Sequence, residues 1–282
     1  MYKMIKFSNS ELEELVKSDI PFNDLTTELM EVQAKAKLCI ITREDITLSC
    51  LDAVSQICKV RELEFYSNFK NSMQARSGTQ ILSVIGDFNT LHATYKTIQN
   101  LLEYACGIAT SANLMLKSVR EISQNCEILV TRKVFPFAKK LCLKAALEGG
   151  AKVHRLGLSD TVLFFENHTN AYINLDEFLS DISKFKNRLC ERKIIVEASD
   201  LEFAKAALKA GSDGVQCDKM SVDEVQNLVE FKNANFPNSI ILAAGGINES
   251  NAAQYTKTGI NAIVTSAVYK GVANLGARIT LL

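Results

Sequence analysis

The sequence has no tryptophan, three prolines and no excess of either charge sign. Its 282 residues carry 32 Lys and Arg against 32 Asp and Glu. This balance argues against a protein that binds nucleic acid or anionic membranes. No apolar run approaches the ~20 residues of a membrane span. The first fifteen residues lack a long apolar core, so we expect no signal peptide.

Cysteine is present, but in no pattern that predicts a metal or redox site. The eight cysteines lie inside apolar segments, and no two of them form a CxxC pair. Zinc-binding and thioredoxin-like chemistry are therefore not expected. Free cysteines that behave as small apolar residues are typical of a reducing compartment, which favours a cytoplasmic protein.

The first hundred residues predict a small layer of helices and strands. Ser10 and Glu13 have the spacing of a capping box that opens a helix over 11–17. Residues 19–27 predict a polar loop, and the alternation over 35–49 predicts a strand or a pair of strands. Further predicted elements are a helix over 52–60, strands over 63–66 and 80–85, and a long helix over 90–122 that is interrupted near Gly107.

The rest of the chain alternates strands and helices. Strands are predicted over 127–131, 162–166, 193–197, 213–218, 239–244 and 262–266. Helices are predicted over 137–148, 175–190, 200–210, 222–233 and 249–258. Short apolar strands that alternate with helices indicate a parallel sheet covered by helices, either a barrel or a doubly wound sheet. No GxGxxG motif follows the first strand, which weakens a dinucleotide-binding fold.

Local signals support several of these helix boundaries. Ser221 with Glu224 predicts a capping box, and Asn174 with Glu177 is a looser version of the same pattern. Two glycines are predicted to end helices in the left-handed conformation, and these are Gly211 and Gly259.

Cationic side chains lie where two of the predicted strands end or begin. Arg132 and Lys133 follow the strand over 127–131, and His154 and Arg155 precede the next apolar run. The carboxyl ends of parallel barrel strands form the active-site face, and Arg and Lys bind phosphate and carboxylate. Each residue alone could be a solvated loop charge, but together they predict an anion-binding site.

Two acidic residues and a glycine pair extend the predicted site. Glu197 and Asp218 end successive strands, where they could hold a divalent metal or stabilise a positive, sugar-like transition state. Either could instead be a helix N-terminal charge. Gly245 and Gly246 precede a predicted helix and could seat a phosphate at its N-terminus, or form only a tight turn. His168 could join this edge or lie on the surface.

Seven short segments spread over nearly the whole chain form a specific set, although each alone would be weak. They are DLTT at 24–27, CGIAT at 106–110, TRK at 131–133, GGAKVHRLGLSD at 149–160, ENH at 166–168, VE at 196–197 and AGGI at 244–247. As a set they resemble the type II phosphoribosyltransferases typified by quinolinate phosphoribosyltransferase. The resemblance implies an N-terminal α/β sandwich, an α/β barrel, and a homodimer whose sites are shared across the interface.

The resemblance also implies domain boundaries and residue roles. The sandwich would span 1–106 and be joined by 270–282, and the barrel would be a catalytic domain over 107–269. Arg132, Lys133, His154 and Arg155 match anion-binding residues, Gly245 and Gly246 match the phosphate loop, and Glu197 and Asp218 match the acidic pair near the ribose and Mg²⁺. Glu197, Asp218 and Lys133 are the residues expected to carry catalysis.

Several positions depart from the family pattern. Phe165 stands where the family has a Lys that meets substrate, and Lys96 replaces an Arg that reaches across the dimer. Phe135 follows the TRK segment in place of a Thr-Thr-Pro-Gly run, Ala244 replaces a Ser, and Ser266 replaces a Gly. These departures are similar to those of the ModD branch, whose proteins are encoded with molybdate-transport systems.

We therefore expect a phosphoribosyltransferase of the ModD type, with Lys96, Phe165 and Ser266 among its substrate-binding residues. It would transfer phosphoribose from phosphoribosyl pyrophosphate to an unidentified acceptor, with Mg²⁺. One alternative is quinolinate phosphoribosyltransferase of NAD synthesis. A second alternative is a non-catalytic protein that binds an anion or a phosphorylated metabolite, which would have no need of the two acidic residues.

Overall fold

The computed structural model describes residues 5–282, and the chain divides into two compact units. The first unit runs to Asn113 and includes Phe135–Gly150 and Tyr269–Leu282. The second consists of Leu114–Val134 and Ala151–Val268. Residues 135–150 thus group by their contacts with the first unit, whereas the sequence-based division assigns them to the barrel.

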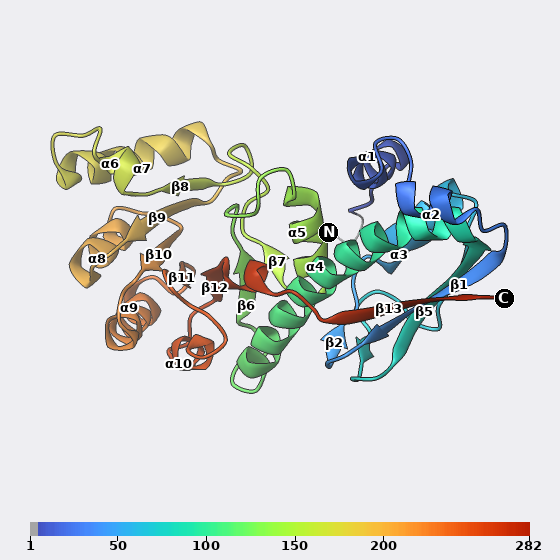
Figure 1. Cartoon of the computed structure of the whole chain (residues 1–282). Helices are drawn as coiled ribbons and strands as arrows, with labels where there is room; N and C mark the ends of the chain where they lie inside the picture. The colour runs from blue at the N-terminus through green and yellow to red at the C-terminus, as the bar shows by residue number, and fades with distance from the viewer. Residues whose placement is uncertain (1–4) are drawn as a thin grey trace. The chain divides into compact units, whose positions relative to one another are not determined.

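The first unit is built on a four-stranded antiparallel sheet in the order β13-β1-β5-β3. Its elements are α1 (Asn9–Asp19), α2 (Leu25–Met30), β1 (Lys35–Thr42), β2 (Ile46–Thr47), α3 (Leu51–Val60), β3 (Glu64–Tyr66), β4 (Gln74–Ala75), β5 (Gln80–Asp87), α4 (Phe88–Arg120, which continues into the second unit), α5 (Lys139–Glu148) and β13 (Leu275–Leu281). The C-terminal strand β13 pairs with β1, and α3 and α4 lie over this sheet (Figure 1). The last residues of the chain thus form part of the sheet of the first unit.

The second unit is an α/β barrel whose seven strands are parallel. In sheet order they are β7 (Lys152–Val153), β6 (Glu127–Val130), β12 (Ala262–Thr265), β11 (Ile240–Ala244), β10 (Gly214–Asp218), β9 (Ile194–Ala198) and β8 (Val162–Phe164). Consecutive strands are neighbours, except that β7 and β8 are not paired with each other, and the last barrel strand, β12, pairs with the first, β6. The expected sandwich and barrel are both present, with one short strand, β7, that the sequence did not predict.

Helices cover the outer face of the barrel strands (Figure 1). They are α6 (Glu166–Thr169), α7 (Leu175–Arg188), α8 (Leu201–Lys209), α9 (Val222–Asn235) and α10 (Ala252–Lys257), and the turn Ala267–Lys270 follows β12. Side chains on the inner face form an apolar cluster that includes Leu163, Ile195 and Leu242. Because strand side chains alternate between faces, residues two positions further along each strand point to the same interior.

Several predicted helix ends are confirmed. Ser221 and Glu224 form the predicted capping box of α9, and Asn174 caps α7 by accepting from the Glu177 backbone N–H. Gly211 and Gly259 have positive φ directly after α8 and α10.

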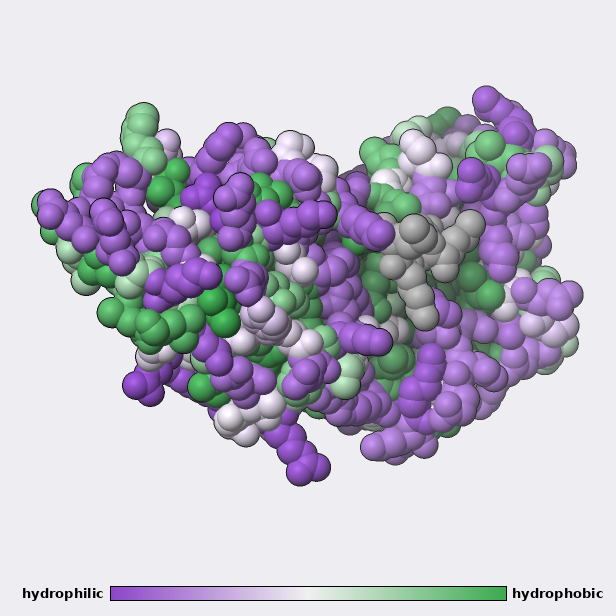
Figure 2. Space-filling model, turned by 90° about the vertical axis from the view of Figure 1, so that its right-hand side faces the viewer, coloured by the Kyte–Doolittle hydropathy of each residue, from purple (hydrophilic) through white to green (hydrophobic). Residues whose placement is uncertain are grey.

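Figure 2 shows hydrophilic residues over much of one face of the molecule, with hydrophobic residues in patches between them.

Other predictions about the first unit are wrong. The capping box of α1 is formed by Ser8 and Glu11 rather than by Ser10 and Glu13, and α2 begins inside the predicted polar loop over 19–27 and extends to Met30. The long helix α4 is not interrupted at Gly107. A Cβ atom at Gly107 would lie 2.5 Å from the backbone of Val272, so glycine there allows close packing instead of breaking the helix.

Candidate functional site

The second unit gathers most of the candidate residues at the carboxyl ends of its strands. Arg132 and Lys133 follow β6, His154 and Arg155 follow β7, Phe165 follows β8, Glu197 and Asp218 lie at the ends of β9 and β10, Gly245 and Gly246 follow β11, and Ser266 follows β12. Because all seven strands are parallel, these ends lie on one face of the barrel. Lys96, by contrast, lies on α4 in the first unit.

Arg155 is the buried cation of this face. Its side chain is 9% exposed, and no carboxylate of residues 5–282 forms an ion pair with it. Burial lowers the pKa of the Arg155 guanidinium, and the charge of Arg132 lowers it further, while Glu197 opposes the change. A guanidinium keeps its proton in proteins, and a buried charge without a partner is unfavourable. Arg155 therefore needs a negative group that this chain does not supply at contact distance.

Arg132 and Lys133 add two exposed cations beside this position. The hydroxyl of Thr131 accepts from the Lys133 backbone N–H at 3.1 Å and fixes the turn that follows β6. The charges of both residues act on other members of the face: Arg132 on Arg155, and Lys133 on Glu197. This is an arrangement that can hold an anion with two or more negative groups.

His154 has a different electrostatic character from its cationic neighbours. Burial lowers the pKa of its imidazole to about 4, and the charge of Arg155 contributes to the decrease. The ring is therefore uncharged at neutral pH. His154 can donate or accept a hydrogen bond at this face, but it does not add a positive charge.

The acidic half of the face consists of Glu197 and Asp218 on adjacent strands. Burial raises the pKa of the Glu197 carboxyl, and the neighbouring charge of Asp218 raises it further. Gln216 opposes this increase, because its Nε2 donates to Glu197 Oε2 at 2.5 Å. The Nζ atom of Lys219 lies 3.9 Å from Asp218 Oδ2.

Two carboxylates are a small ligand set for a metal. No group of three or more His, Cys, Asp or Glu side chains that could hold an ion occurs between residues 5 and 282. Mg²⁺ is commonly bound by one or two carboxylates together with the phosphate oxygens of a substrate. Glu197 and Asp218 fit that role, because they are two carboxylates on adjacent strands that lie close enough for their charges to interact.

The glycine pair forms a loop whose geometry excludes side chains. Gly245 and Gly246 have φ values of 85° and 79°. A Cβ atom at Gly245 would lie 2.5 Å from the Lys219 backbone N and 2.7 Å from Asp218 Oδ1. The predicted helix at 249 in fact begins at Ala252 and has six residues. The pair therefore lies in a loop and not at a helix N-terminus.

Phe165 presents an apolar ring to the same face. It packs against the interior cluster of the barrel, and its ring lies edge-on to His168 with 4.2 Å between the centroids. His168 itself is exposed, and its Nδ1 accepts from the Phe165 backbone N–H at 3.3 Å. His168 thus stabilises the turn after β8. Its exposure agrees with the alternative that it lies on the surface.

The two remaining candidates are exposed or half-buried polar groups. Ser266 lies in the turn after β12, where the Thr265 hydroxyl donates to the Ile247 carbonyl at 2.7 Å and connects this turn to the glycine loop. Lys96 is exposed on α4, with its Nζ donating to Gln99 Oε1 at 3.0 Å.

Sequence reasoning missed two residues of this face. Gln216 is buried on β10, and its spacing of two from Asp218 places both on the inner face of the strand. Asp160 acts electrostatically on His154 and Arg155 while its carboxylate accepts from the Leu156 backbone N–H at 3.0 Å. The period-two spacing could have indicated Gln216, and Asp160 is the last residue of the segment GGAKVHRLGLSD, in which no role was assigned to it.

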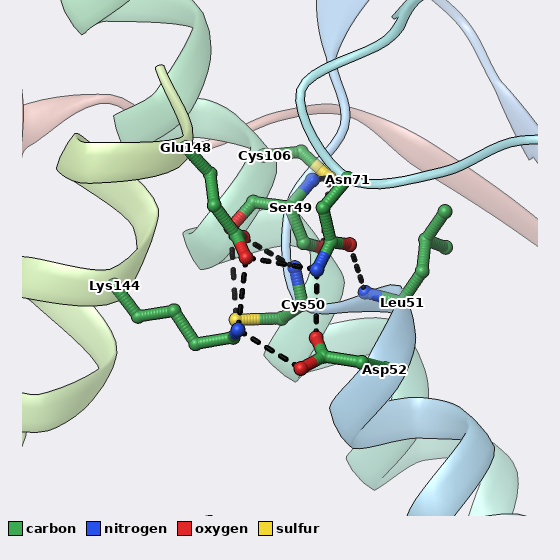
Figure 3. A network of polar contacts seen from close by, with 8 residues as sticks. All are labelled: Ser49, Cys50, Leu51, Asp52, Asn71, Cys106, Lys144 and Glu148. Atoms are coloured by element: carbon green, nitrogen blue, oxygen red, sulfur yellow. Dashed lines mark hydrogen bonds and ion pairs between the residues drawn. The ribbon is translucent and has the colours of Figure 1, made fainter. Parts of the chain in front are cut away.

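A second polar cluster, which the sequence did not predict, lies within the first unit (Figure 3). Lys144 Nζ lies 3.0 Å from Asp52 Oδ2 and 2.8 Å from Glu148 Oε1. Asn71 donates to both carboxylates, at 2.7 Å and 2.8 Å. Glu148 also accepts from the Cys50 backbone N–H at 3.0 Å. This paired cluster, defined as Asp52, Asn71, Lys144 and Glu148, caps the start of α3, where Cys50 supplies no side-chain cap.

Comparison with known protein families assigns both parts of the chain. Residues 24–106 match the quinolinate phosphoribosyl transferase N-terminal domain, and residues 108–278 match the C-terminal domain. The chain belongs to the quinolinate phosphoribosyl transferase family. This is a family of phosphoribosyltransferase enzymes, so the enzyme class expected from the sequence is confirmed.

Relatives within the quinolinate phosphoribosyl transferase family include proteins named ModD. The ModD protein of Rhodobacter capsulatus is 32% identical over 257 residues, which cover 91% of this chain and 98% of the relative. That of Pasteurella multocida is 29% identical and covers 94% and 95%. The nicotinate-nucleotide pyrophosphorylase (carboxylating) of Mycobacterium leprae is 28% identical and covers 86% and 82%. The resemblance to the ModD branch is thereby confirmed.

Solved structures of the family share the fold. The nicotinate-nucleotide pyrophosphorylase of Ehrlichia chaffeensis has a TM-score of 0.88 at 21% identity and covers 98% of this chain and 100% of that structure. The enzyme of Francisella tularensis has a TM-score of 0.86 at 22% identity, with 98% of both chains covered. Among residues 5–282, no helix is long and apolar enough to cross a membrane.

Proposed function

We propose that this protein is a cytoplasmic phosphoribosyltransferase of the ModD type, which transfers phosphoribose from phosphoribosyl pyrophosphate to a ring acceptor. The observation that carries the proposal is Arg155 on the barrel face, a buried guanidinium that forms no ion pair within residues 5–282. A polyanionic substrate supplies the negative charge that this guanidinium lacks. Arg132 and Lys133 provide further cations for the same substrate.

The chemistry follows from the separation of cations and carboxylates on this face. In the transfer, the bond between ribose C1 and the pyrophosphate oxygen breaks, and the oxygen keeps the electron pair. The acceptor atom donates a pair to C1, and pyrophosphate leaves. Arg132, Lys133 and Arg155 would hold the leaving group, whereas Glu197 and Asp218 would face the positive charge that develops at the ribose.

Magnesium belongs to the proposal as a companion of the substrate. Glu197 and Asp218 would hold Mg²⁺, which would supply positive charge beside the pyrophosphate leaving group. The retained acidic pair favours an enzyme over a non-catalytic anion-binding protein, because a site that only binds anions is weakened by two carboxylates.

The acceptor is proposed to carry less negative charge than quinolinate. Phe165 offers an apolar ring at the position where the family pattern has a Lys. Burying a carboxylate without a cation is unfavourable, so a dicarboxylate fits this position poorly. We therefore favour an acceptor with more apolar ring surface, in a pathway that is linked to molybdate handling as in the ModD branch.

A homodimer is also part of the proposal. Several apolar residues of α4 are already buried within the chain, among them Leu101, Leu102 and Ile108. Tyr104 on α4 and Phe137 remain exposed along a groove of about 850 Å³ in the first unit. Exposed apolar surface of this kind is typical of an interface. Light scattering is expected to give about twice the chain mass of 31.2 kDa; a value near the single-chain mass at micromolar concentration would contradict the dimer.

The direct test is incubation with phosphoribosyl pyrophosphate, Mg²⁺ and a panel of ring acceptors, with pyrophosphate release as the readout. The panel should include quinolinate, pyridine monocarboxylates and neutral heteroaromatic rings. We expect release with an acceptor less charged than quinolinate. Efficient turnover of quinolinate, with kcat/KM above about 10⁴ M⁻¹s⁻¹, would favour the NAD-synthesis alternative. Saturable binding without release for any acceptor would favour the non-catalytic alternative.

A further inference from the structure

Gln216 is a buried polar residue next to the carboxylates of the proposed site. It lies on β10, two positions before Asp218, and is 4% exposed. Gln216 and Glu197 are direct partners in the register of β10 and β9. The carboxamide Nε2 donates to Glu197 Oε2 at 2.5 Å, whereas Oε1 is buried and has no hydrogen-bond partner among the residues that the structure describes.

The neighbouring carboxylate explains this orientation of the amide. Rotation of the carboxamide by half a turn would place Oε1 against Glu197 Oε2, so that two acceptors would face each other. The donor therefore has to point to Glu197, and the carbonyl oxygen is left without a partner. A buried unsatisfied acceptor is unfavourable, and an apolar side chain of similar length would fill the same space without it.

The hydrogen bond from Gln216 has a consequence for the geometry of Glu197. A carboxylate on a flexible side chain can rotate, and the hydrogen bond from Gln216 fixes the plane of the group. It also occupies Oε2 and leaves Oε1 of Glu197 available for a ligand. Preorganised groups at a reacting centre are effective because they need no rearrangement during the reaction.

We propose that Gln216 is a positioning residue that holds Glu197 in the orientation needed to bind phosphoribosyl pyrophosphate. The inference rests on the proposed function, since Glu197 is the group that contacts the substrate. Gln216 acts through Glu197 and does not itself touch the ligand. Its contribution should therefore disappear when the Glu197 carboxylate is removed.

A double-mutant cycle on the full-length protein tests this coupling. Titration calorimetry with phosphoribosyl pyrophosphate and Mg²⁺ would be performed on the wild type, Gln216→Met, Glu197→Ala and the double variant. Gln216→Met should weaken binding about tenfold, and in the Glu197→Ala background it should cause no further loss. The thermal unfolding temperature of the Gln216→Met variant should stay the same or rise, because the unsatisfied carbonyl of Gln216 is removed.

Two further variants separate positioning from a general structural effect. Gln216→His keeps an N–H donor at a similar distance and should recover most of the affinity. Gln226→Met is the matched control, because Gln226 Nε2 donates to Glu230 Oε1 at 2.8 Å on the exposed face of α9, and it should leave affinity unchanged.

The outcomes distinguish failure of the inference from failure of the proposed function. Absence of saturable binding by the wild type would overturn the proposed function, and this inference with it. Wild-type binding combined with unchanged affinity in Gln216→Met would overturn the inference alone. The same conclusion would follow from an equal loss in the Glu197→Ala background, or from failure of Gln216→His to recover affinity.

Discussion

The two polar clusters of this protein differ in whether their charges are matched. In the paired cluster of the first unit, Lys144 contacts two carboxylates, and Asn71 donates to both of them. On the barrel face of the second unit, Arg155 is 9% exposed, compared with 6% for Lys144, and it forms no ion pair within residues 5–282. Both clusters contain basic and acidic residues, but only in the first is the buried cation paired with carboxylates of the described residues.

The pKa shifts express the same difference. In the paired cluster, burial opposes ionisation, but Asn71 and Lys144 outweigh it and lower the pKa of the Asp52 carboxyl. Glu148 and Asp52 likewise raise the pKa of Lys144 against the effect of burial. On the barrel face, burial prevails, and it raises the pKa of Glu197 while lowering that of Arg155. Removing one partner of a matched buried pair destabilises a fold, whereas buried groups with perturbed pKa values and no matching partner are candidates for a functional site.

The largest expected effect comes from breaking the paired cluster. Lys144→Met would leave Glu148 and Asp52 without their cation, and removing one partner of a buried ion pair lowers the free energy of unfolding by about 3–5 kcal/mol. Because Asp52 is half-exposed, we expect a decrease near the lower end of this range. Chemical denaturation would measure it, with Lys184→Met as control, because Lys184 and Asp181 form an exposed pair at 3.6 Å. Equal effects of the two substitutions would remove the distinction between the clusters.

Substitution of Arg155 should lower the free energy of unfolding by less than substitution of Lys144 does. Arg155→Ala removes a buried charge without a partner, so the free energy of unfolding should not fall by the amount expected for a paired buried charge. Binding of phosphoribosyl pyrophosphate should weaken by roughly 1.5–3 kcal/mol, the size of a hydrogen bond to a charged group. Calorimetry and denaturation on the same samples would check both. Loss of stability with unchanged affinity would assign Arg155 to the fold.

A cation introduced at Phe165 should improve the use of a dicarboxylate. Phe165→Lys places an ammonium where the family pattern has one, and a charge-assisted contact of about 1.5–3 kcal/mol corresponds to a ten- to hundredfold gain. Steady-state kinetics with quinolinate and phosphoribosyl pyrophosphate would compare the wild type with this variant. Efficient quinolinate turnover by the wild type would contradict the proposed acceptor preference.

The smallest expected effect concerns the pH dependence of stability. The pKa of His154 is lowered from 6.5 to about 4, so between these values the unfolded chain binds a proton that the folded chain does not. The free energy of unfolding should therefore fall as the pH decreases from about 6.5 towards 4. Partial exposure limits this contribution to about 1–2 kcal/mol. His154→Gln should flatten the decrease in denaturation curves measured between pH 7 and pH 5, and an unchanged slope would exclude His154 as its source.

The sequence predicted the barrel well because its strands and helices follow from local patterns. Apolar runs, the capping box at Ser221 and the glycines at helix ends are all readable within a few residues. The α1 boundary was missed because Ser8 with Glu11 and Ser10 with Glu13 have the same spacing. Burial of Leu12 and Val16, which depends on tertiary packing, accompanies the first alternative.

The features missed from the sequence depend on residues that are far apart along the chain. Lys144 and Asp52 are 92 positions apart, so no local pattern connects them. Gly107 favours a helix break locally, but its close contact with Val272 explains why glycine is needed inside α4. Strand β7 has two residues, which are too few to show the alternation of apolar and polar residues that predicts a strand. Family resemblance predicted the barrel-face residues, which are far apart along the chain and belong to different strand ends.

The most direct test of the comparison is calorimetric titration of the wild-type protein with phosphoribosyl pyrophosphate and Mg²⁺. If the unmatched charges of the barrel face form a substrate site, binding should saturate at one ligand per chain and weaken as salt concentration rises. Lys144→Met, measured at a temperature where it remains folded, should bind with wild-type affinity. Absence of saturable binding by the wild type at millimolar ligand would contradict the account.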